Sequence, residues 1–426
     1  MSNLTPAKPS PTPRTRVVVT GMGAITPLGL TPETYWRNLL AGKSGISPVT
    51  LFDASSYRTR IAAEVKNFDA TRYGIDTKDA RRMGRATLFI LAATKDALNA
   101  AGLGDSLAED NRAGVIVGTG LGGFAEAIKE HDAFTRQGTR RVSPFLAAVI
   151  LPNMPAFYVA QHFRARGFNS TVVTTCAAGT DAIGTATEVI RRGAADIMLA
   201  GGTDAIISDI IFTAFGAMRA LSTRNDDPTH ACRPFDKHRD GLVIGEGAAT
   251  LVLEKLEHAL ARHAKIYAEV LGYTANSDAL HFVAPDPAAI GATQVMRDAL
   301  TDANLSIDQI DYINAHATST LLNDPSETLA IKNVFGARAY QIPISATKSM
   351  IGHAMGAAGA FEAMVCALTI RDQKIHPTVN YETPDPACDL DYVPNVARQA
   401  KVDIAMSNSF GFGGQNACLI LSKFSG

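Results

Sequence analysis

The feature that most constrains the fold of this chain is a series of short strands, each followed by small residues and a helical pattern. Examples lie at 113–117, 171–175 and 194–200. Their residues are mostly apolar or β-branched, as in strands covered on both faces. Alternation of such strands with helices predicts a layered α/β fold with buried sheets.

The strand pattern occurs twice along the chain. Segments 113–123, 171–179 and 196–202 run from strand into small-residue loops, and segments 311–320, 342–348 and 403–414 repeat the arrangement. We therefore expect two duplicated α/β halves, 17–268 and 269–426, whose loops share one end, where α/β sheets bind ligands. We also expect a strand over 17–20 that is broken at Gly21 and Gly23, and one helix over 79–101.

Composition excludes several classes of protein. The 426 residues are 46% hydrophobic and 19% charged, which is a globular balance. The net charge of −1 leaves no basic field for nucleic acid, and no stretch approaches the ~18–20 apolar residues of a membrane span. Five cysteines without a C-x-x-C pair argue against disulfides or zinc and for a reducing, cytoplasmic compartment.

The first 16 residues are rich in proline, serine and threonine and carry no acidic residue. They lack the apolar core of a secretory signal, so we expect a flexible tail, with a short targeting segment as the alternative.

Two short motifs are weak. Gly118-x-Gly120-x-x-Gly123 resembles a dinucleotide fingerprint, but no convincing strand with a terminal acid follows it. Ser345-x-x-Lys348 resembles a β-lactamase motif without its companion motifs. No metal-ligand spacing occurs among the ten histidines, so we expect no metal.

Cys176 is the strongest candidate nucleophile. It ends a β-branched strand and precedes a run of small residues and a helical pattern over 181–192. The sulfur is thus expected at a helix N-terminus, where the dipole would lower its pKa. The alternative is a buried structural cysteine.

Two histidines follow strands of the second half. His316 lies in a polar loop, and His353 precedes a glycine- and alanine-rich helix. One cysteine and two histidines at one end of the sheets predict acyl transfer to sulfur, followed by chemistry on a second carbonyl. Lys348 and Glu362 are expected to form a buried charge pair.

These residues lie in motifs that resemble the β-ketoacyl–acyl-carrier-protein synthases, closest to the type II elongation enzyme. The resemblance extends from residue 17 to the end. It rests on TTCAAGTDAIG at 174–184, HATST at 316–320, TKSMIGH at 347–353 and SNSFGFGG at 407–414, with support from RALSTRNDDP, RPFDKHRDG and CDLDYVPN. It implies a thiolase-like fold of αβαβα layers.

The resemblance also implies a mechanism. Cys176 would take an acyl chain from a carrier protein's phosphopantetheine, with the N–H groups of Cys176 and Phe412 as the oxyanion hole. His316 and His353 would then bind the carbonyl of malonyl–carrier protein during loss of CO2 and condensation, giving a 3-oxoacyl product in fatty acid elongation. Lys348 would orient the site.

Further roles follow from the same resemblance. They are pantetheine binding by Thr318 and Thr320, gating by Phe410 and Phe412, and an acyl-pocket floor at Leu121. No cofactor is implied beyond the carrier's phosphopantetheine, and a homodimer is expected. Carrier docking is assigned to a basic face of the predicted helix and to one further arginine: Lys78, Arg81, Arg82, Arg85 and Arg219.

Departures from the family pattern occur at Ala317, Leu321, Ile351, Cys232 and Val283. Ala317 replaces a common glycine, so we expect a backbone angle there that suits a Cβ. The departures leave open a type II polyketide or specialised-lipid ketosynthase with the same chemistry. A non-catalytic chain-length subunit is disfavoured because such subunits lack the nucleophile, and a degradative thiolase because SNSFGFGG offers no second cysteine.

Overall fold

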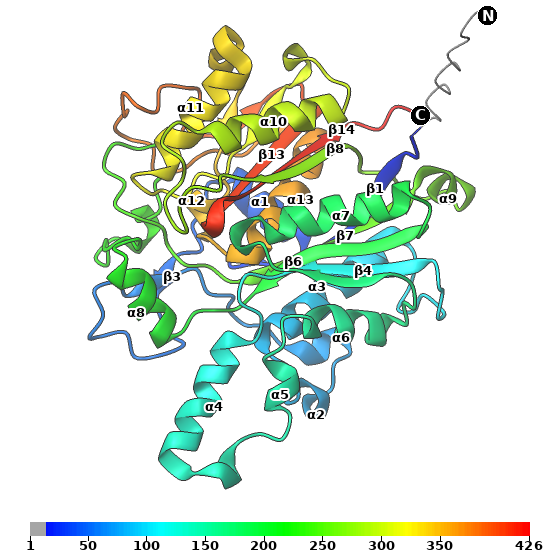
Figure 1. Cartoon of the computed structure of the whole chain (residues 1–426), viewed down its shortest axis with the longest axis vertical. Coiled ribbons are helices and arrows are strands. Elements are labelled where there is room, and N and C mark those ends of the chain that lie inside the picture. The colour runs from blue at the N-terminus through cyan, green and yellow to red at the C-terminus, as the bar shows by residue number, and fades with distance from the viewer. Residues whose placement is uncertain (1–13) are drawn as a thin grey trace, which may run out of the picture.

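The computed structural model describes residues 14–426 and has five layers (Figure 1). Helices α7 (Ala178–Arg191) and α13 (Ala358–Asp372) pack against each other between the two parts of the β-structure. Outer helices α3 (Arg85–Ala101) and α6 (Met154–Phe163) cover one side, and α10 (Ile290–Asp302) and α11 (Asn323–Phe335) cover the other. The expected layered α/β architecture is therefore present.

Ten strands form one hydrogen-bonded order, β10-β9-β13-β14-β8-β1-β7-β6-β4-β5. Its two sets of five have the same arrangement. If the strands of each set are numbered one to five along the chain, they lie side by side in the order third, second, fourth, fifth, first. The third, second and fourth strands are parallel, and the fifth and the first are each antiparallel to the strand before them in this order. The first set is β1 (Val17–Ile25), β4 (Ala113–Gly118), β5 (Asn169–Val172), β6 (Ile197–Asp204) and β7 (Gly247–Lys255). The second is β8 (Ala268–Ser277), β9 (Tyr312–Asn314), β10 (Ile344–Ser345), β13 (Ile404–Gly411) and β14 (Gln415–Ser422).

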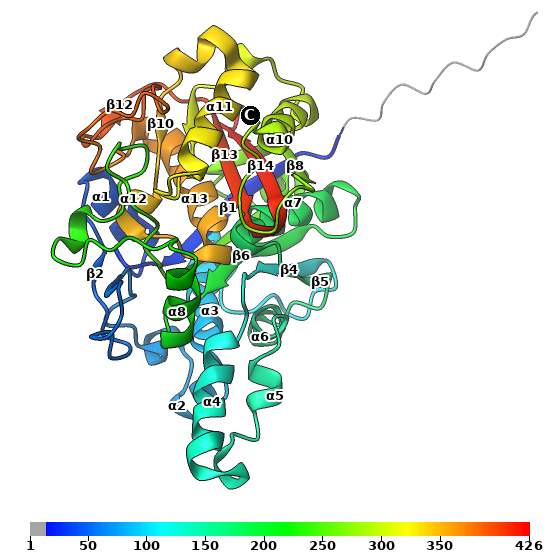
Figure 2. The same ribbon diagram turned by 60° about the vertical axis from the view of Figure 1, so that its left-hand side comes forward.

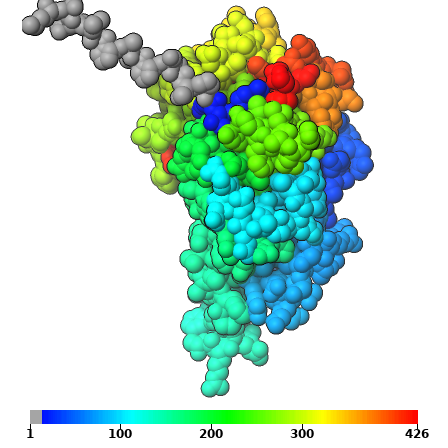
Figure 3. Space-filling model, turned by 90° about the vertical axis from the view of Figure 1, so that its right-hand side faces the viewer, coloured from blue at the N-terminus to red at the C-terminus, as the bar shows by residue number. Residues whose placement is uncertain are grey.

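The remaining elements are short or peripheral. They are α1 (Pro32–Leu40), β2 (Ser47–Pro48), β3 (Ile61–Ala62), α2 (Thr77–Ala80), α4 (Phe124–Gln137), α5 (Leu146–Val149), α8 (Asp209–Ala217), α9 (Leu256–Ala261), α12 (Lys348–Ile351), β11 (Lys374–Ile375) and β12 (Arg398–Gln399). Helices α4 and α5 project from the body as a separate lobe (Figures 2 and 3).

The central helix α13 is buried on every side from Ala358 to Ile370. A helix that is buried all round belongs inside a layered fold, and its alanines allow close approach of strands from both sets and of α7. The loops of the candidate site described below lie around the N-terminal ends of α7 and α13.

Two local predictions are wrong. The strand β1 does not stop at Gly21 or Gly23, because it needs these glycines for close packing on α3: a Cβ would lie 2.1 Å from the Ala97 oxygen and 1.9 Å from the Ala93 oxygen, respectively. The single helix expected over 79–101 is two helices, α2 and α3, separated at residues 81–84.

The predicted tail lies largely outside the described residues. Of its last residues, Arg16 makes a two-pronged ion pair with Glu269, and Arg14 pairs with Glu188 and Asp302. These residues are thus attached to the body.

Candidate active site

Cys176 lies in a single 3-10 turn, Thr175–Ala177, between β5 and α7. The preceding Thr175 has a φ of +52°, which is uncommon for a β-branched residue, and its hydroxyl donates to the Phe412 carbonyl at 3.1 Å. Gly411 passes so close that a Cβ there would lie 2.3 Å from the Thr175 oxygen. The loop after β13 therefore holds the sharp turn that presents the sulfur.

The pKa of the Cys176 thiol is opposite to the sequence expectation. Burial raises it to about 11, against the opposing effects of the Lys348 charge and the Phe412 N–H. Burial is the largest effect on this pKa, so the resting group is a protonated thiol at neutral pH.

His316 follows β9, and its tautomer is fixed by Lys348. The Lys348 ammonium lies 3.3 Å from His316 Nδ1 and can only donate, so Nδ1 accepts and Nε2 carries the proton. Burial, with the charge of Lys348, lowers the pKa of His316 well below its usual value. His316 is therefore a neutral Nε2–H donor.

His353 follows α12 and has the same tautomer for a different reason. The Met355 N–H donates to His353 Nδ1 at 3.3 Å, which leaves the proton on Nε2. This Nε2 is buried and has no hydrogen-bond partner among residues 14–426. Burial and Lys348 also lower the pKa of His353, so both imidazoles are neutral.

The thiol and the two imidazoles converge. One ligand atom from each of Cys176, His316 and His353 lies within 4.8 Å of the others, and the two rings are nearly perpendicular at 5.4 Å. With a proton on each Nε2, the two imidazoles present hydrogen-bond donors beside the thiol, an arrangement that suits a carbonyl oxygen.

Lys348 and Glu362 form a buried ion pair at the base of the site, from α12 and α13. Burial raises the pKa of Glu362 to about 7, against the effect of Lys348. The pair places one positive charge beside His316 inside an otherwise apolar layer.

The loop after β9 corrects another expectation. Ala317 has a φ of +38° and Ser319 a φ of +66°, so the alanine occupies a left-handed conformation that favours glycine. Glu327 of α11 stabilises this loop by accepting the N–H groups of His316 and Ala317 at 2.8 and 2.7 Å. Glu327 was not found from the sequence, where an acid in a helix between polar residues carries no distinguishing signal.

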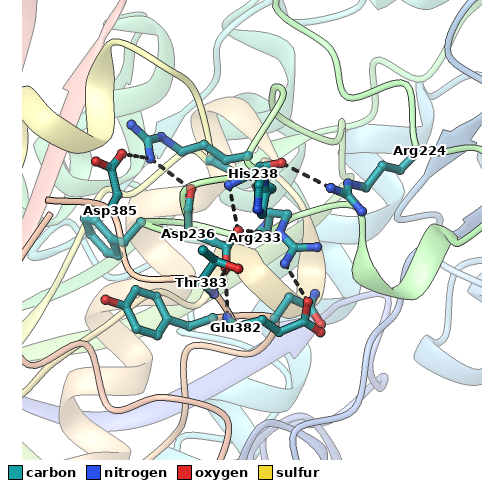
Figure 4. A network of polar contacts seen from close by, with 12 residues as sticks. Arg224, Arg233, Asp236, His238, Glu382, Thr383 and Asp385 are labelled. Carbon is teal, nitrogen blue, oxygen red and sulfur yellow. Dashed lines mark hydrogen bonds and ion pairs between the residues drawn. The ribbon is translucent and has the colours of Figure 1, made fainter. Parts of the chain in front are cut away.

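A second polar network, centred on Asp236, contacts the same loop; Figure 4 shows the network itself. The Asp236 carboxylate accepts the N–H groups of His238, Glu382 and Thr383 at 2.6–2.8 Å and pairs with Arg233. The backbone N–H of Arg233 donates to Ser319 Oγ at 2.9 Å, and Arg239 donates to the Thr320 carbonyl at 3.0 Å.

A cavity of about 370 Å³ opens onto the three reactive groups. Its wall contains Thr318 and Thr320, whose hydroxyls are 2.9 Å apart, together with Phe410 and Phe412. The Phe410 ring lies 5.9 Å from that of His316, and the Phe412 ring stacks on Phe215 at 5.9 Å.

Comparisons with known proteins identify the family. Residues 14–259 match the family model described as "Beta-ketoacyl synthase, N-terminal domain", and residues 267–382 match the one described as "Beta-ketoacyl synthase, C-terminal domain". The chain belongs to the β-ketoacyl synthase family. The predicted family, thiolase-like fold class and acyltransferase class are therefore confirmed.

Relatives match nearly the whole chain. A 3-oxoacyl-[acyl-carrier-protein] synthase 2 from Synechocystis sp. is 48% identical over 96% of this chain and 98% of its own. The enzyme of that name from Coxiella burnetii is 47% identical with the same coverage. Among solved structures, the ishigamide ketosynthase/chain length factor has a TM-score of 0.90 at 39% identity, covering 97% of this chain and 100% of that one.

A further solved relative shows a type II PKS ketosynthase in complex with its acyl-carrier protein, bound to the hexaketide. It has a TM-score of 0.89 and 34% identity, and covers 96% of this chain and 100% of that chain.

The positions predicted for the acyl pocket and for carrier docking lie farther from the three reactive groups or only partly at the cavity. Leu121 does not line the cavity and is 37% exposed in the single chain. Arg219 lines the cavity, whereas Lys78, Arg81 and Arg82 lie at α2 and the break after it. Arg85 begins α3 and pairs with the buried Glu246 at 2.6 Å. The expected single basic helix face is thus wrong, because two helices carry these residues and Arg85 points inward.

Proposed function

We propose that this chain catalyses the decarboxylative Claisen condensation of malonyl–acyl carrier protein with an acyl thioester on Cys176. The products are 3-oxoacyl–acyl carrier protein and CO2, in fatty acid elongation. The observation that carries the proposal is the convergence of one thiol with two neutral Nε2–H donors in one cavity.

Acylation comes first. The sulfur attacks the thioester carbonyl, and the thiol proton passes to the carrier's sulfur, because both imidazoles already hold a proton on Nε2 and accept a hydrogen bond at Nδ1. The backbone N–H groups of Cys176 and Phe412 receive the oxyanion, and the carrier thiol leaves with the proton. The pantetheine arm then vacates the channel beside Thr318 and Thr320.

Condensation uses the histidines as hydrogen-bond donors. The malonyl thioester oxygen lies between the Nε2–H groups of His316 and His353, so charge that develops there is stabilised more than in the ground state. The bond to the carboxylate breaks, CO2 leaves, and the electron pair forms an enolate. Its carbon attacks the acyl–Cys176 carbonyl, and the sulfur leaves as a thiolate that regains a proton.

Phe410 and Phe412 gate the acyl chain in this scheme. Gly413 and Gly414, with φ of +80° and +67°, provide a backbone that can rearrange around them. Lys348 orients His316 and pairs with Glu362.

The partner is an acyl carrier protein that docks through Lys78, Arg81, Arg82 and Arg219, which are free of the inward ion pair made by Arg85. Phosphopantetheine arrives on that partner, and no other cofactor is required. The enzyme acts in the cytoplasm. No helix within residues 14–426 is long and apolar enough to cross a membrane.

A second copy of the chain completes the enzyme. The strand β5 is one of the two end strands of the sheet, and Val173 beyond it is 50% exposed. An unpaired edge with apolar neighbours favours pairing across a two-fold axis. Such a homodimer would cover Val173 and turn Leu121 from a surface residue into the floor of the acyl pocket. The halves of each chain meet at residues 268 and 269, where β8 begins.

A type II polyketide ketosynthase with the same chemistry is the second candidate. It is favoured by the likeness to the two ketosynthases above and by the changed residues Leu321 and Val283, both of which line the cavity. A non-catalytic chain-length subunit is disfavoured because Cys176, His316 and His353 are all present.

Intact mass spectrometry tests the proposal. The protein is incubated with acyl–carrier proteins of graded length, and malonyl–carrier protein is then added. We expect one acyl adduct, absent in Cys176→Ala, that disappears as 3-oxoacyl product forms. The proposal is wrong if wild type forms no adduct or if Cys176→Ala still condenses. The length profile separates elongation from the polyketide alternative.

A further inference from the structure

Asp204 is a fully buried carboxylate that the mechanism above does not use. It is the last residue of β6, at the end of the sheet where the catalytic loops meet. Four hydrogen-bond donors surround it. Oδ1 accepts from the Thr119 hydroxyl at 2.8 Å and the Leu121 N–H at 3.3 Å, and Oδ2 accepts from the N–H groups of Gly120 at 2.7 Å and Gly356 at 2.6 Å.

These donors come from both sets of strands. Thr119, Gly120 and Leu121 belong to the loop after β4, whereas Gly356 belongs to the turn between His353 and α13. Backbones approach too closely here for side chains: a Cβ on Gly356 would lie 2.4 Å from the Gly120 nitrogen. Three peptide N–H groups, those of Gly120, Leu121 and Gly356, converge on this point, and an acceptor that takes several hydrogen bonds satisfies them together.

The turn that Asp204 holds is the turn that fixes His353. Met355 has a φ of +46°, a left-handed conformation that is unfavourable for a residue with a Cβ. Its N–H nevertheless donates to His353 Nδ1 and so keeps the proton on Nε2. The next N–H along the chain, that of Gly356, is bound by Asp204. The carboxylate therefore holds the peptide that follows Met355, and through it the strained residue whose N–H fixes the His353 tautomer.

We propose that Asp204 is a positioning residue that couples the Leu121 loop to His353. It holds the Nε2–H of His353 toward the malonyl carbonyl through Gly356 and Met355, and it holds the loop after β4 through Thr119, Gly120 and Leu121. It touches neither substrate. The inference rests on the proposed function, because it predicts different effects on the two half-reactions, acylation of Cys176 and release of CO2.

The test uses Asp204→Asn, which keeps the shape but turns an amide N–H₂ toward N–H donors. The matched control is Asp311→Asn. Asp311 accepts two backbone N–H groups, those of Asp403 and Ile404 at 2.8 and 2.9 Å, and precedes β9 at the opposite end from the catalytic loops. Two rates are measured on each protein: acylation of Cys176 by intact mass, and CO2 release from malonyl–carrier protein. Thermal unfolding is recorded alongside.

For Asp204→Asn we expect CO2 release to fall at least tenfold, while acylation with the shortest acyl donor falls less than threefold. We expect both rates of Asp311→Asn to stay within twofold of wild type, although its Tm falls by about as much as that of Asp204→Asn. A fall of both rates in equal proportion, or no fall, overturns the inference. Failure of wild type in either reaction would instead contradict the proposed function.

Asp204→Glu provides the second variant if Asp204→Asn does not fold. It keeps the negative charge and moves it by one methylene. We expect CO2 release by Asp204→Glu to be faster than by Asp204→Asn. If only Asp204→Glu can be measured, we expect its CO2 release to fall more than its acylation, by a smaller factor than that given for Asp204→Asn. An Asp204→Glu protein in which the two rates fall together contradicts the positioning role.

Discussion

Removing the Lys348–Glu362 pair should uncouple the two half-reactions. Lys348→Met alone would leave Glu362 buried without a partner, which costs about 3–5 kcal/mol of stability. The double variant Lys348→Met/Glu362→Gln removes both charges and keeps the volume. It leaves His316 Nδ1 without the donor that now lies at 3.3 Å.

The size of the effect on His316 follows from that distance. At an effective dielectric constant of about 20, two unit charges 3.3 Å apart interact by about 5 kcal/mol. This corresponds to an upper limit of roughly 3 to 4 on the rise in the pKa of His316 when the ammonium is lost. The Nε2–H tautomer is also no longer enforced. We expect malonyl decarboxylation and condensation to fall about 10²- to 10³-fold, the range found when one oxyanion donor is lost.

Acylation of Cys176 should suffer less, because its oxyanion is bound by backbone N–H groups. We expect a fall below about tenfold, owing to the loss of a charge that lowers the thiol pKa. Single-turnover acylation and CO2 release are measured from pH 5.5 to 9. The acid limb of CO2 release should move to higher pH in the double variant. Equal losses in both reactions, or an unmoved acid limb, would refute the role given to Lys348.

Three further predictions concern the thiol, the histidine loop and the docking residues. Alkylation of Cys176 by iodoacetamide should rise about tenfold per pH unit from pH 7 to 10, because the thiol pKa is about 11; a plateau below pH 8 would show a resting thiolate. Ala317→Gly should change the free energy of unfolding by less than about 0.5 kcal/mol, because relief of backbone strain at the φ of +38° offsets the loss of the buried methyl group and the added entropy of the unfolded chain. The control Ala363→Gly, in the helix α13, should lower the free energy of unfolding by about 2 kcal/mol. Similar losses at both positions would contradict the strain at Ala317. Arg81→Glu/Arg82→Glu should raise KM for carrier-protein substrates at least fivefold and leave small thioesters unchanged; equal effects would remove these residues from the docking surface.

The sequence predicted the catalytic loops because strand ends are easy to locate. Apolar segments that stop at Cys176, His316 and Lys348 place those side chains at one end of the sheets, whichever helices cover them. Glycines were harder to interpret. Gly21 and Gly23 predicted a turn, yet they permit contact between β1 and α3, and only the tertiary partner distinguishes these two uses of glycine.

Charge and backbone strain were the properties that sequence could not provide. The Cys176 pKa depends on the competition between a helix terminus and burial, and burial is set by residues hundreds of positions away. Ala317 has a strained, left-handed backbone, and this strain is offset because Glu327 accepts the N–H groups of His316 and Ala317. The strained residue and the carboxylate that stabilises it lie on different elements of the fold. The break at residues 81–84 likewise depends on a distant contact: Glu126 of α4 accepts the Arg85 N–H at 2.8 Å.

Neutral histidines have a chemical consequence for the condensation. An imidazolium beside the enolate could transfer its proton to carbon, which would release an acyl thioester and waste the malonyl group. A neutral Nε2–H can stabilise the enolate oxygen, but it is far too weak an acid to protonate it. Burial lowers the pKa of both His316 and His353, and the charge of Lys348 acts in the same direction. In the proposed reaction, burial and the Lys348 ammonium therefore act together, because they keep both donors in the protonation state in which carbon–carbon bond formation outcompetes proton transfer.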